Sequence, residues 1–275
     1  MSSDHRTPKS VGVLISCMFQ DIGIIERTHV QTNVVVVNQC DEESIKEYDF
    51  VNKKGRSCHV KFISTCERGL SRSRNMAIRN CYDDICVICD DDEVLSDDYE
   101  AMILEGYEYF PSASVVTFML EREYSNNRNY PQPPGKRHNF VSILKTNSLE
   151  ITFKREDVLA NEIAFDEMMG SGTGNGAGEE EKFLMDIRRK GLQLYFYAKT
   201  IATVHQGQSR WFKGYDNEYF RNKGWSARRI FGGPISIVYL GYFVISHYNL
   251  FKKDISVIPM ITSLVKGWFS KRVKK

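Results

Sequence analysis

The chain has 275 residues, which is enough for one large α/β domain or two smaller ones. Its hydrophobic fraction of 42% and charged fraction of 26% exclude a disordered or collagen-like chain. The net charge of +2 is unevenly distributed, because residues 251–275 carry seven basic residues and one acidic residue. That segment has a net charge of +6 and the rest of the chain −4, which argues against general nucleic-acid binding and suggests a surface partner for the tail.

The cysteines and the polar N-terminus favour a cytoplasmic protein. All seven cysteines lie in the first third of the chain without the spacing of a disulfide framework, so we expect reduced thiols. Residues 1–10 lack the apolar core of a signal peptide. Cys86 and Cys89 have the spacing of half a zinc site, but side chains three apart in a strand face opposite sides. We therefore expect both thiols to be small buried hydrophobic groups.

Residues 11–89 show the pattern of βαβ units around a mostly parallel sheet. Four short apolar, β-branched runs alternate with helical or turn-like stretches. These runs are Val11–Cys17, Val34–Val37, Val60–Ile63 and Ile85–Cys89. A helix is expected from Gly69 to Arg79, with Ser71 as its N-cap. The predicted fold class is α/β, and open sheets of this class bind their ligands at the carboxyl ends of the strands.

An acidic run, Asp90-Asp91-Asp92-Glu93, directly follows the last of these strands. Four adjacent carboxylates repel one another, and Mg²⁺ or Mn²⁺ can compensate them while bridging to a diphosphate. In an extended segment Asp90 and Asp92 point the same way, so they could share one metal ion. The alternative interpretation is a solvated acidic turn before the next helix, which Ser96 and the aspartates after it could also cap.

The middle of the chain continues the alternation of helices and strands. The expected elements are a helix at Tyr99–Phe110, strands at Val115–Leu120 and Leu149–Phe153, and a short helix around Glu156–Ala160. Residues 121–139 form a polar loop that contains three prolines. We expect substrate specificity to depend on loops of this kind.

A glycine-rich stretch follows, with glycine at every second position from Gly170 to Gly178. Such a backbone must be mobile or tightly turned. The stretch lacks a Gly-Lys-Ser/Thr ending and leads into three glutamates that would repel a phosphate, so it matches neither a dinucleotide nor a phosphate loop. We interpret it as a flexible lid over a reaction centre.

The next helix, Glu179–Lys190, carries a candidate general base. Glu180 falls near the centre of its apolar stripe, and Glu179 and Glu181 fall toward the edges. Partial burial would raise the pKa of the Glu180 carboxyl, which suits it to take a proton from a hydroxyl. Glu180 is therefore the predicted base and Glu179 its substitute, although all three glutamates would also favour the positive helix N-terminus. Gly191 is expected to end the helix in a left-handed conformation.

His205 follows two further strand-like runs, Leu192–Ala198 and Ile201–Val204. A lone histidine at a strand end is most often structural or exposed. It is also a reasonable third ligand beside two aspartates for an ion such as Mn²⁺. Sequence spacing does not show whether these side chains meet, so both interpretations stay open.

The C-terminal part is apolar and then basic. The run Ile235–Ile245 is shorter than the roughly 20 residues needed to cross a bilayer. The apolar positions of Ile255–Val265 and the basic segment Lys266–Lys275 suit the interface of an anionic membrane. A helical pair packed on the rest of the chain, with a solvated basic end, is an equally good interpretation.

Three motifs in this order resemble the inverting glycosyltransferases of family 2, over roughly residues 10–230. The segment Gly69–Ala77 is similar to the glycine and Ala-Arg-Asn segment before the acidic strand end in that family. Asp90-Asp91-Asp92 resembles the DxD motif, and the helix from Gly178 to Gly191 resembles the Gly-Glu-Asp helix. The resemblance implies a GT-A catalytic domain over residues 1–230, with a mostly parallel sheet flanked by helices, and a helical extension over residues 231–275.

The resemblance also implies roles for the acidic residues. Asp90 would face the nucleotide ribose or the metal, Asp92 would bind Mn²⁺ or Mg²⁺, and Glu180 would be the base at the family's aspartate position. His205 resembles a histidine that follows the last core strand in several members, which supports it as a metal ligand.

Residues of the nucleotide pocket follow from the same resemblance. Asp41, Arg74 and Asp91 would help to hold the nucleotide. The family's usual motifs after the first two strands are replaced here by Ser16–Phe19 and Asn38–Asp41. The nucleotide base is therefore left open among uridine, guanosine and thymidine, with a UDP-sugar as our expectation.

The predicted reaction moves a sugar from a nucleotide diphosphate sugar to an acceptor hydroxyl, with inversion at the anomeric carbon. If the tail binds membrane, we expect a lipid-linked glycan as acceptor, in bacterial cell-surface polysaccharide synthesis, and a peripheral location on the inner face of the cell membrane. One alternative is a metal-dependent nucleotidyltransferase, for which a basic phosphate loop is missing. Another is a catalytically silent subunit that binds carbohydrate or membrane.

Overall fold

A computed structural model describes residues 8–122, 135–205 and 214–270. The chain divides into two units. The sheet unit comprises Met1–Arg68, Arg72–Ala164 and Asp186–Gly207. The helical unit comprises Gly69–Ser71, Phe165–Met185 and Gln208–Lys275. The helical unit thus joins the glycine-rich stretch to all of the C-terminal helices, whereas we expected a boundary at residue 230.

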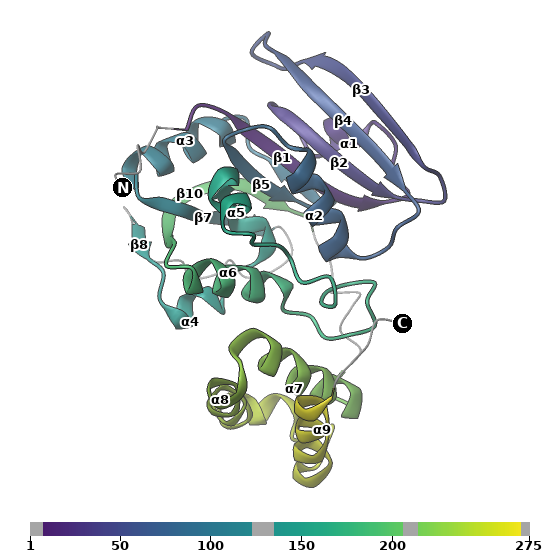
Figure 1. The fold of residues 1–275 in the computed structure, drawn as a ribbon, viewed down its shortest axis with the longest axis vertical. Helices are drawn as coiled ribbons and strands as arrows, with labels where there is room; N and C mark the ends of the chain where they lie inside the picture. Colours follow the sequence, from purple (N-terminus) through teal and green to yellow (C-terminus); the bar gives the residue numbers. More distant parts are fainter. Residues whose placement is uncertain (1–7, 123–134, 206–213, 271–275) are drawn as a thin grey trace. The chain divides into compact units, whose positions relative to one another are not determined.

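One mixed sheet forms the centre of the sheet unit (Figure 1). Its strands are β1 Val11–Met18, β2 Asn33–Gln39, β3 Ser44–Val51, β4 Ser57–Thr65, β5 Ile85–Cys89, β6 Glu93–Leu95, β7 Ala113–Arg122, β8 Gly135–Arg137, β9 Ile151–Lys154 and β10 Gln193–Val204. Their order in the sheet is β3-β4-β2-β1-β5-β9-β7-β10-β6, and β8 pairs with β10. The run β4-β2-β1-β5 is parallel, as the βαβ pattern predicted. Strand β7 is also parallel to β10, and the other pairs are antiparallel.

The central strands are buried on both faces. In β1 and β5 almost every side chain is buried, which explains why they read as continuous apolar runs and not as alternating ones. Cys86 and Cys89 are fully buried in β5, as predicted.

Three helices agree with the predicted positions: α2 Leu70–Asn80, α3 Tyr99–Tyr109 and α5 Arg155–Ala160. Two short helices, α1 Ile24–Arg27 and α4 Phe140–Ile143, and a 3₁₀ turn at Ser148–Glu150 were not predicted. The prediction of Ser71 as an N-cap was wrong, because α2 begins one residue earlier. The Ser71 hydroxyl is buried and donates instead to the carbonyl of Met169, at 2.9 Å.

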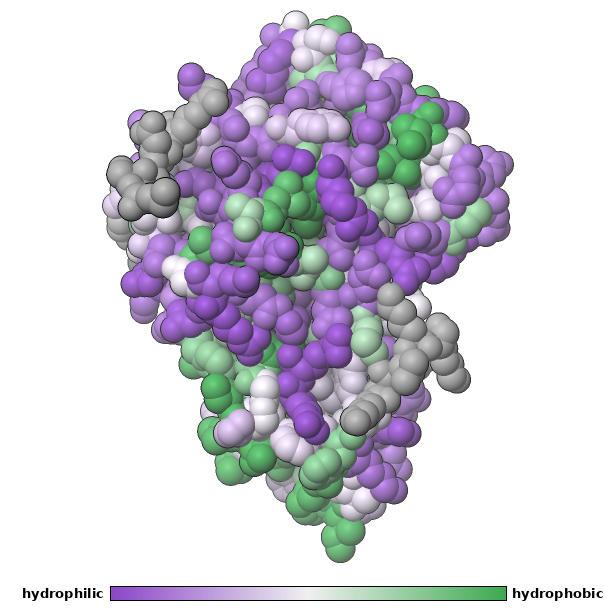
Figure 2. Space-filling model, viewed as in Figure 1, coloured by the Kyte–Doolittle hydropathy of each residue, from purple (hydrophilic) through white to green (hydrophobic). Residues whose placement is uncertain are grey.

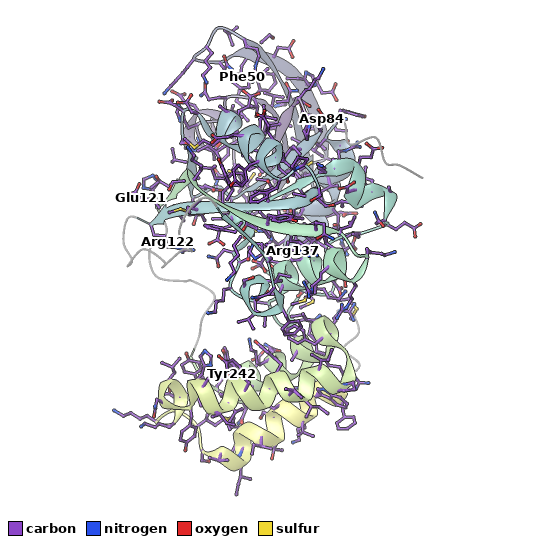
Figure 3. The ribbon with its side chains drawn as sticks, turned by 90° about the vertical axis from the view of Figure 1, so that its left-hand side faces the viewer. Phe50, Asp84, Glu121, Arg122, Arg137 and Tyr242 are labelled. Carbon is purple, nitrogen blue, oxygen red and sulfur yellow. The ribbon has the colours of Figure 1, made fainter. Side chains whose placement is uncertain are left out.

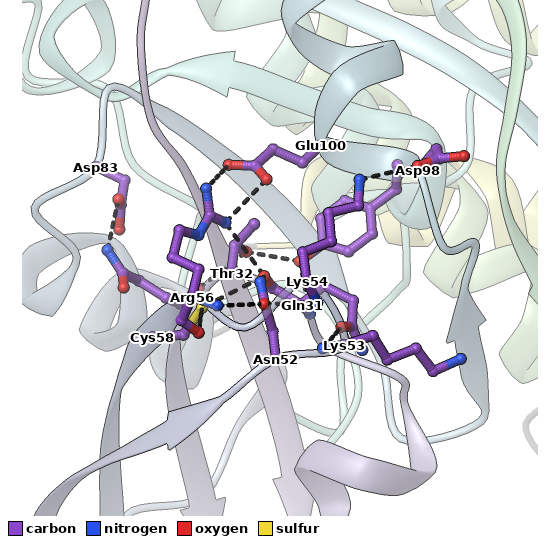
Figure 4. A network of polar contacts seen from close by, with 12 residues as sticks. Gln31, Thr32, Asn52, Lys53, Lys54, Arg56, Cys58, Asp83, Asp98 and Glu100 are labelled. Atoms are coloured by element: carbon purple, nitrogen blue, oxygen red, sulfur yellow. Dashed lines mark hydrogen bonds and ion pairs between the residues drawn. The ribbon is translucent and has the colours of Figure 1, made fainter.

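Strand β3 was not predicted from the sequence. It lies at the edge of the sheet, antiparallel to β4, and it is mostly exposed and rich in charged residues, as edge strands often are. The turn between β3 and β4 is tied to the start of α3 by ion pairs (Figure 4). Lys54 lies 2.9 Å from Asp98, and Arg56 lies 2.8 Å from Glu100.

The two strand-like runs predicted near the end of the sheet unit form one strand, β10. Its pairing with β7 shifts register between Phe196 and Thr200, and again between Thr200 and Ala202, which explains the broken pattern in the sequence. The predicted polar loop 121–139 lies partly outside the described residues. Its last part forms β8, antiparallel to β10.

The helical unit contains the start of α6 Glu179–Arg189, then α7 Asn217–Phe231, α8 Gly233–Phe251 and α9 Val257–Phe269. Gly191 has a φ of +81° just after α6, as predicted. Helices α7 and α9 cross closely because each offers a glycine at the contact. A Cβ at Gly224 would overlap the carbonyl oxygen of Leu264, and one at Gly267 would overlap that of Arg221. Among the described residues, the helices lack the combination of length and apolarity that a membrane span requires.

Candidate active site

Polar side chains gather where the parallel strands of the sheet unit end. Because β1, β2, β4 and β5 run the same way, the residues that follow them reach one edge of the sheet. Phe19 follows β1, Asp41 comes soon after β2, Arg68 soon after β4, and Asp90 directly after β5. The parallel sheet therefore collects the predicted nucleotide and metal residues of this unit along one edge.

Asp90 is paired with a buried arginine. Arg74 comes from α2 and is 1% exposed, and its Nη2 lies 3.3 Å from Oδ1 of Asp90. We expected a metal ion to compensate the acidic run and Arg74 to hold the nucleotide. The structure shows that the Arg74 guanidinium compensates part of the acidic charge and fixes the Asp90 carboxylate.

Asp91 is exposed and is held by the residue that follows Phe19. The side-chain amide of Gln20 donates to the Asp91 carboxylate at 3.0 Å. Asn38, at the end of β2, in turn clamps the backbone of Gln20: its Oδ1 accepts from the Gln20 N–H and its Nδ2 donates to the Gln20 carbonyl, both at 2.9 Å. The ends of β1, β2 and β5 are thus connected by side-chain hydrogen bonds.

Asp41 lies beside Arg68 and an exposed aromatic ring. Arg68 pairs with the Asp41 carboxylate at 2.5 Å and also donates to the Cys40 carbonyl at 2.9 Å. The Arg68 guanidinium lies 5.6 Å from the centre of the Phe19 ring. Phe19 has a φ of +52°, a conformation that non-glycine residues adopt rarely and that turns the chain at the end of β1. The Asp41 carboxylate, the Arg68 guanidinium and the Phe19 ring therefore lie near one another, just after the ends of β2, β4 and β1.

Asp92 and His205 are neighbours through the backbone. Strand β6 begins one residue after Asp92 and pairs with β10, and the His205 N–H donates to the Asp92 carbonyl at 3.1 Å. The Asp92 side chain is half-buried, and His205 is exposed. The structure thus places His205 next to the acidic run, which the sequence could not show.

Glu93, the last residue of the acidic run, is inside the protein. It is 1% exposed and pairs in register with Val204 of β10. Burial raises the pKa of the Glu93 carboxyl well above 4.5, and the negative charge of Asp90 raises it further. Of the four carboxylates that we expected at the end of β5, three therefore lie at the sheet edge, and that of Glu93 is buried.

A divalent cation fits the aspartates of this edge only together with a substrate. Among the described residues, no three acidic, histidine or cysteine side chains come close enough to hold a metal ion by themselves. Asp90, Asp92 and His205 therefore do not form a metal site of three protein ligands by themselves. Mg²⁺ and Mn²⁺ nevertheless bind commonly through one or two carboxylates plus substrate phosphates, and the oxygen donors of Asp90 and Asp92 fit that mode. The role of His205 as a metal ligand stays a prediction.

The predicted base belongs to the helical unit, at the start of α6. The helical stripe placed Glu180 furthest inward, but Glu179 is the more buried residue, 4% exposed, and Glu180 is half-buried. The reason lies in the preceding glycines. A Cβ at Gly170 would stand 2.9 Å from Cδ of Glu179, so the bare backbone leaves space for that carboxylate. Glu179 also accepts from the Gly178 N–H at 3.1 Å, which leaves Glu180 as the more accessible glutamate of the two.

The glycine-rich stretch is tightly turned and closely packed at both ends. Positive φ values occur at Gly170, Gly172, Gly174 and Gly178. At Gly176 a Cβ would overlap the Ser226 hydroxyl and stand 2.9 Å from the carbonyl oxygen of residue 222, both in α7. The lid interpretation stays a prediction for the exposed middle of the stretch.

Glu181 links the first turn of α6 to the C-terminal helices. Burial raises the pKa of the Glu181 carboxyl, and the positive charge of Lys223 in α7 offsets part of this effect. The Lys223 ammonium lies 4.9 Å from the ring centre of Phe243 and 5.4 Å from that of Tyr239, both in α8. The segment with the candidate base is therefore packed against α7, whose Lys223 side chain reaches α8.

Sequence reasoning missed Gln20 and Arg68 of the sheet edge, and it named the segments that contain Phe19 and Asn38 without giving either residue a role. Their only sequence signal is a position at or just after the end of a predicted strand, which Asp41 shares. The hydrogen bonds and ring contact that give them a place in the site depend on strand order, and this cannot be read from spacing.

The model of the family described as Glycosyl transferase family 2 matches residues 23–170. No protein of curated function matches the chain in sequence.

Solved structures of Staphylococcus aureus TarS share the fold. The structure of TarS residues 1–349 has a TM-score of 0.62 at 13% identity, and covers 95% of this chain and 81% of the TarS chain. The structure of the same TarS fragment in complex with UDP-GlcNAc has a TM-score of 0.63 at 14% identity, with 94% and 81% covered. The family match spans more than half of the residues, and the fold agrees. The chain therefore belongs to glycosyl transferase family 2, and its catalytic fold is GT-A.

Proposed function

We propose that the protein transfers a sugar from a UDP-sugar to an acceptor hydroxyl with inversion at the anomeric carbon. The observation that carries this proposal is the pair Asp90 and Asp92 at the carboxyl end of β5, with Asp90 fixed by the buried Arg74. The resemblance of Asp90-Asp91-Asp92 to the DxD motif implies that a nucleotide diphosphate would meet these carboxylates through a cation.

Asp90 and Asp92 would hold Mn²⁺ or Mg²⁺, with His205 as a further ligand. Such an ion supplies positive charge that stabilises a departing diphosphate. Arg74 keeps the Asp90 carboxylate in one orientation, and Gln20 does the same for Asp91. The role of these residues is positional, because each holds a carboxylate before the donor arrives.

The nucleoside would lie between the ends of β1 and β2. The exposed ring of Phe19 can stack on a planar base, and the Asp41 carboxylate can accept hydrogen bonds from base N–H groups. Uridine is favoured because TarS, which shares the fold, has been solved with UDP-GlcNAc.

Glu180 would take the proton from the acceptor hydroxyl as that oxygen attacks the anomeric carbon. It is half-buried at the start of a helix, next to the more deeply buried Glu179. One proton leaves the acceptor, one bond forms to the sugar, and the bond to the diphosphate breaks. Glu179 is the substitute for this role.

For the acceptor we propose a lipid-linked glycan in the assembly of a bacterial cell-surface polysaccharide. The protein would then work in the cytoplasm as a peripheral protein at the inner face of the cell membrane, reached through residues 235–275. The apolar and basic character of that segment supports this location.

A thermal-shift panel tests the donor. UDP-, GDP- and dTDP-sugars are each added with and without Mn²⁺, because at equal concentration a ligand that binds the native state more tightly stabilises it more. We expect the largest shift with a UDP-sugar plus Mn²⁺. Equal shifts for all nucleotides, or none, would contradict the proposed donor.

A further inference from the structure

The outer side of α8 is apolar and exposed. The helix contains no Asp, Glu, Lys or Arg from Gly233 to Phe251. One stripe of side chains packs inward, and the opposite stripe faces solvent with Val238 at 74%, Tyr242 at 64% and Ile245 at 82% exposure. Figure 3 labels Tyr242 on this helix. An outward stripe of this kind is unusual for a helix of a soluble protein, because polar residues normally occupy it.

Helix α9 repeats this arrangement. Its inward stripe is buried against the unit, and its outward stripe carries large apolar side chains at helical spacing. These are Ile258, which is 80% exposed, and the exposed residues Ile261, Val265 and Phe269. Figure 2 shows hydrophobic side chains gathered over these two helices. We call the outward stripes of α8 and α9, from Val238 to Ile245 and from Ile258 to Phe269, the outer face.

Positive charge accompanies the outer face. Lys252 and Lys253, between α8 and α9, are exposed, and so is Lys266 on α9. The only acidic residue in the sequence from residue 233 to residue 275 is Asp254. Apolar stripes bordered by lysines match the chemistry of an anionic lipid surface, where hydrocarbon lies beneath negative headgroups.

We propose that the outer face inserts into the interfacial layer of an anionic membrane. This inference deepens the proposed function, because a lipid-linked acceptor would be met at that surface. A second copy of the chain fits less well as the occupant. Two copies joined by the same face would bring the same lysines together, whereas anionic headgroups complement them.

The packing of the helical unit gives this docking a catalytic consequence. Helix α7 crosses α9 at Gly224 and Gly267, and it also contacts the glycine-rich stretch at Gly176. The outer face and the segment that leads to Glu180 therefore belong to one packed unit. Docking the outer face would hold that segment at the membrane, where a lipid-linked acceptor is confined.

Vesicle flotation tests the proposal with the full chain and no nucleotide. The vesicles are pure phosphatidylcholine or phosphatidylcholine mixed with phosphatidylglycerol. Ile245→Gln and Ile258→Gln should each lower binding about tenfold, because each removes one large apolar side chain from the lipid. Lys252→Gln should lower binding about fivefold, on the anionic vesicles only. The matched control is Ile45→Gln on β3, at 63% exposure, which should bind like wild type.

The outcomes separate this proposal from its alternatives. Undiminished flotation of Ile245→Gln and Ile258→Gln overturns it, and so does equal binding to neutral and anionic vesicles. A dimer in sedimentation velocity that Ile258→Gln dissociates, without vesicle binding by wild type, assigns the face to a second copy. Thermal unfolding of the variants should match wild type, since the replaced side chains are exposed. Donor binding in the thermal-shift panel involves no lipid, so failure of one proposal is distinguishable from failure of the other.

Discussion

The guanidinium of Arg74 is buried within 3.3 Å of the Asp90 carboxylate, at the point where β5 delivers the acidic run to the sheet edge. Removing only the cation would leave a partly buried carboxylate beside other acidic groups. We expect Arg74→Met to lower the free energy of unfolding by about 3 kcal/mol in urea titrations. The exposed pair of Arg27 with Asp21 is the control, and Arg27→Met should change stability little. Equal stability of Arg74→Met and wild type would contradict the role given to this pair.

Glu180 and Glu179 can be separated by rate and by stability. Glu180→Gln should lower kcat by about a hundredfold or more, with unchanged donor binding and melting temperature, because it removes a proton acceptor without changing shape. Glu179→Gln should chiefly lower the melting temperature, since this carboxylate is buried against the glycine-rich stretch. If the rate loss instead follows Glu179, the base is Glu179. Full activity of both variants would remove these glutamates from the mechanism.

Glu93 makes stability depend on pH in a defined direction. Its pKa is raised in the folded protein, first by burial and then by Asp90, so the folded state binds more protons than the unfolded chain. The stability of wild type should therefore fall as the pH rises from about 4.5 through the folded-state pKa. Glu93→Gln should match wild type near the acid end and exceed it at higher pH.

Melting temperatures across this pH range measure the effect of Glu93. Glu108→Gln, at an exposed position of α3, is the control and should leave the wild-type profile unchanged. Parallel profiles for Glu93→Gln and wild type would show that the Glu93 carboxyl titrates as it does in the unfolded chain.

Gly176 sets the distance between the glycine-rich stretch and α7. A Cβ there would overlap Ser226 and press on backbone, so Gly176→Ala should lower stability by about 1–3 kcal/mol. Gly241→Ala is the matched control, because nothing lies within 4 Å of the added atom on α8. This change should stabilise the helix by about 0.5–1 kcal/mol. Denaturant titrations of both variants compare the two directly.

Much of the sheet could be predicted because β1, β2, β4 and β5 carry their own signal. Each is a short β-branched run that is buried on both faces, or nearly so, and bounded by polar residues. Strand β3 could not be predicted, because charged residues at an exposed edge interrupt its apolar pattern, and the partial burial of Tyr48 and Phe50 depends on packing that the sequence does not show. The three-residue β6 owes its existence to pairing with β10, which lies more than a hundred residues further along the chain.

The site was predictable in its acidic residues and less so in their surroundings. The run from Asp90 to Asp92 stands out because it follows an apolar strand. The burial of Glu93 depends on β10, and the burial of Glu179 depends on the space that Gly170 leaves. A helical projection of α6 does not include the space that Gly170 leaves for Glu179, which is why the projection ranked Glu180 as the inward glutamate.

The central claim is that Asp90 and Asp92 bind the diphosphate of a sugar donor through a divalent cation. Product analysis after incubation with UDP-GlcNAc and other UDP-sugars in Mn²⁺ tests it most directly. The account predicts release of UDP by wild type, which is lost on chelation of the metal and in Asp92→Asn, while the variant keeps its melting temperature. Release of pyrophosphate, or release of UDP that neither chelation nor Asp92→Asn reduces, would contradict it.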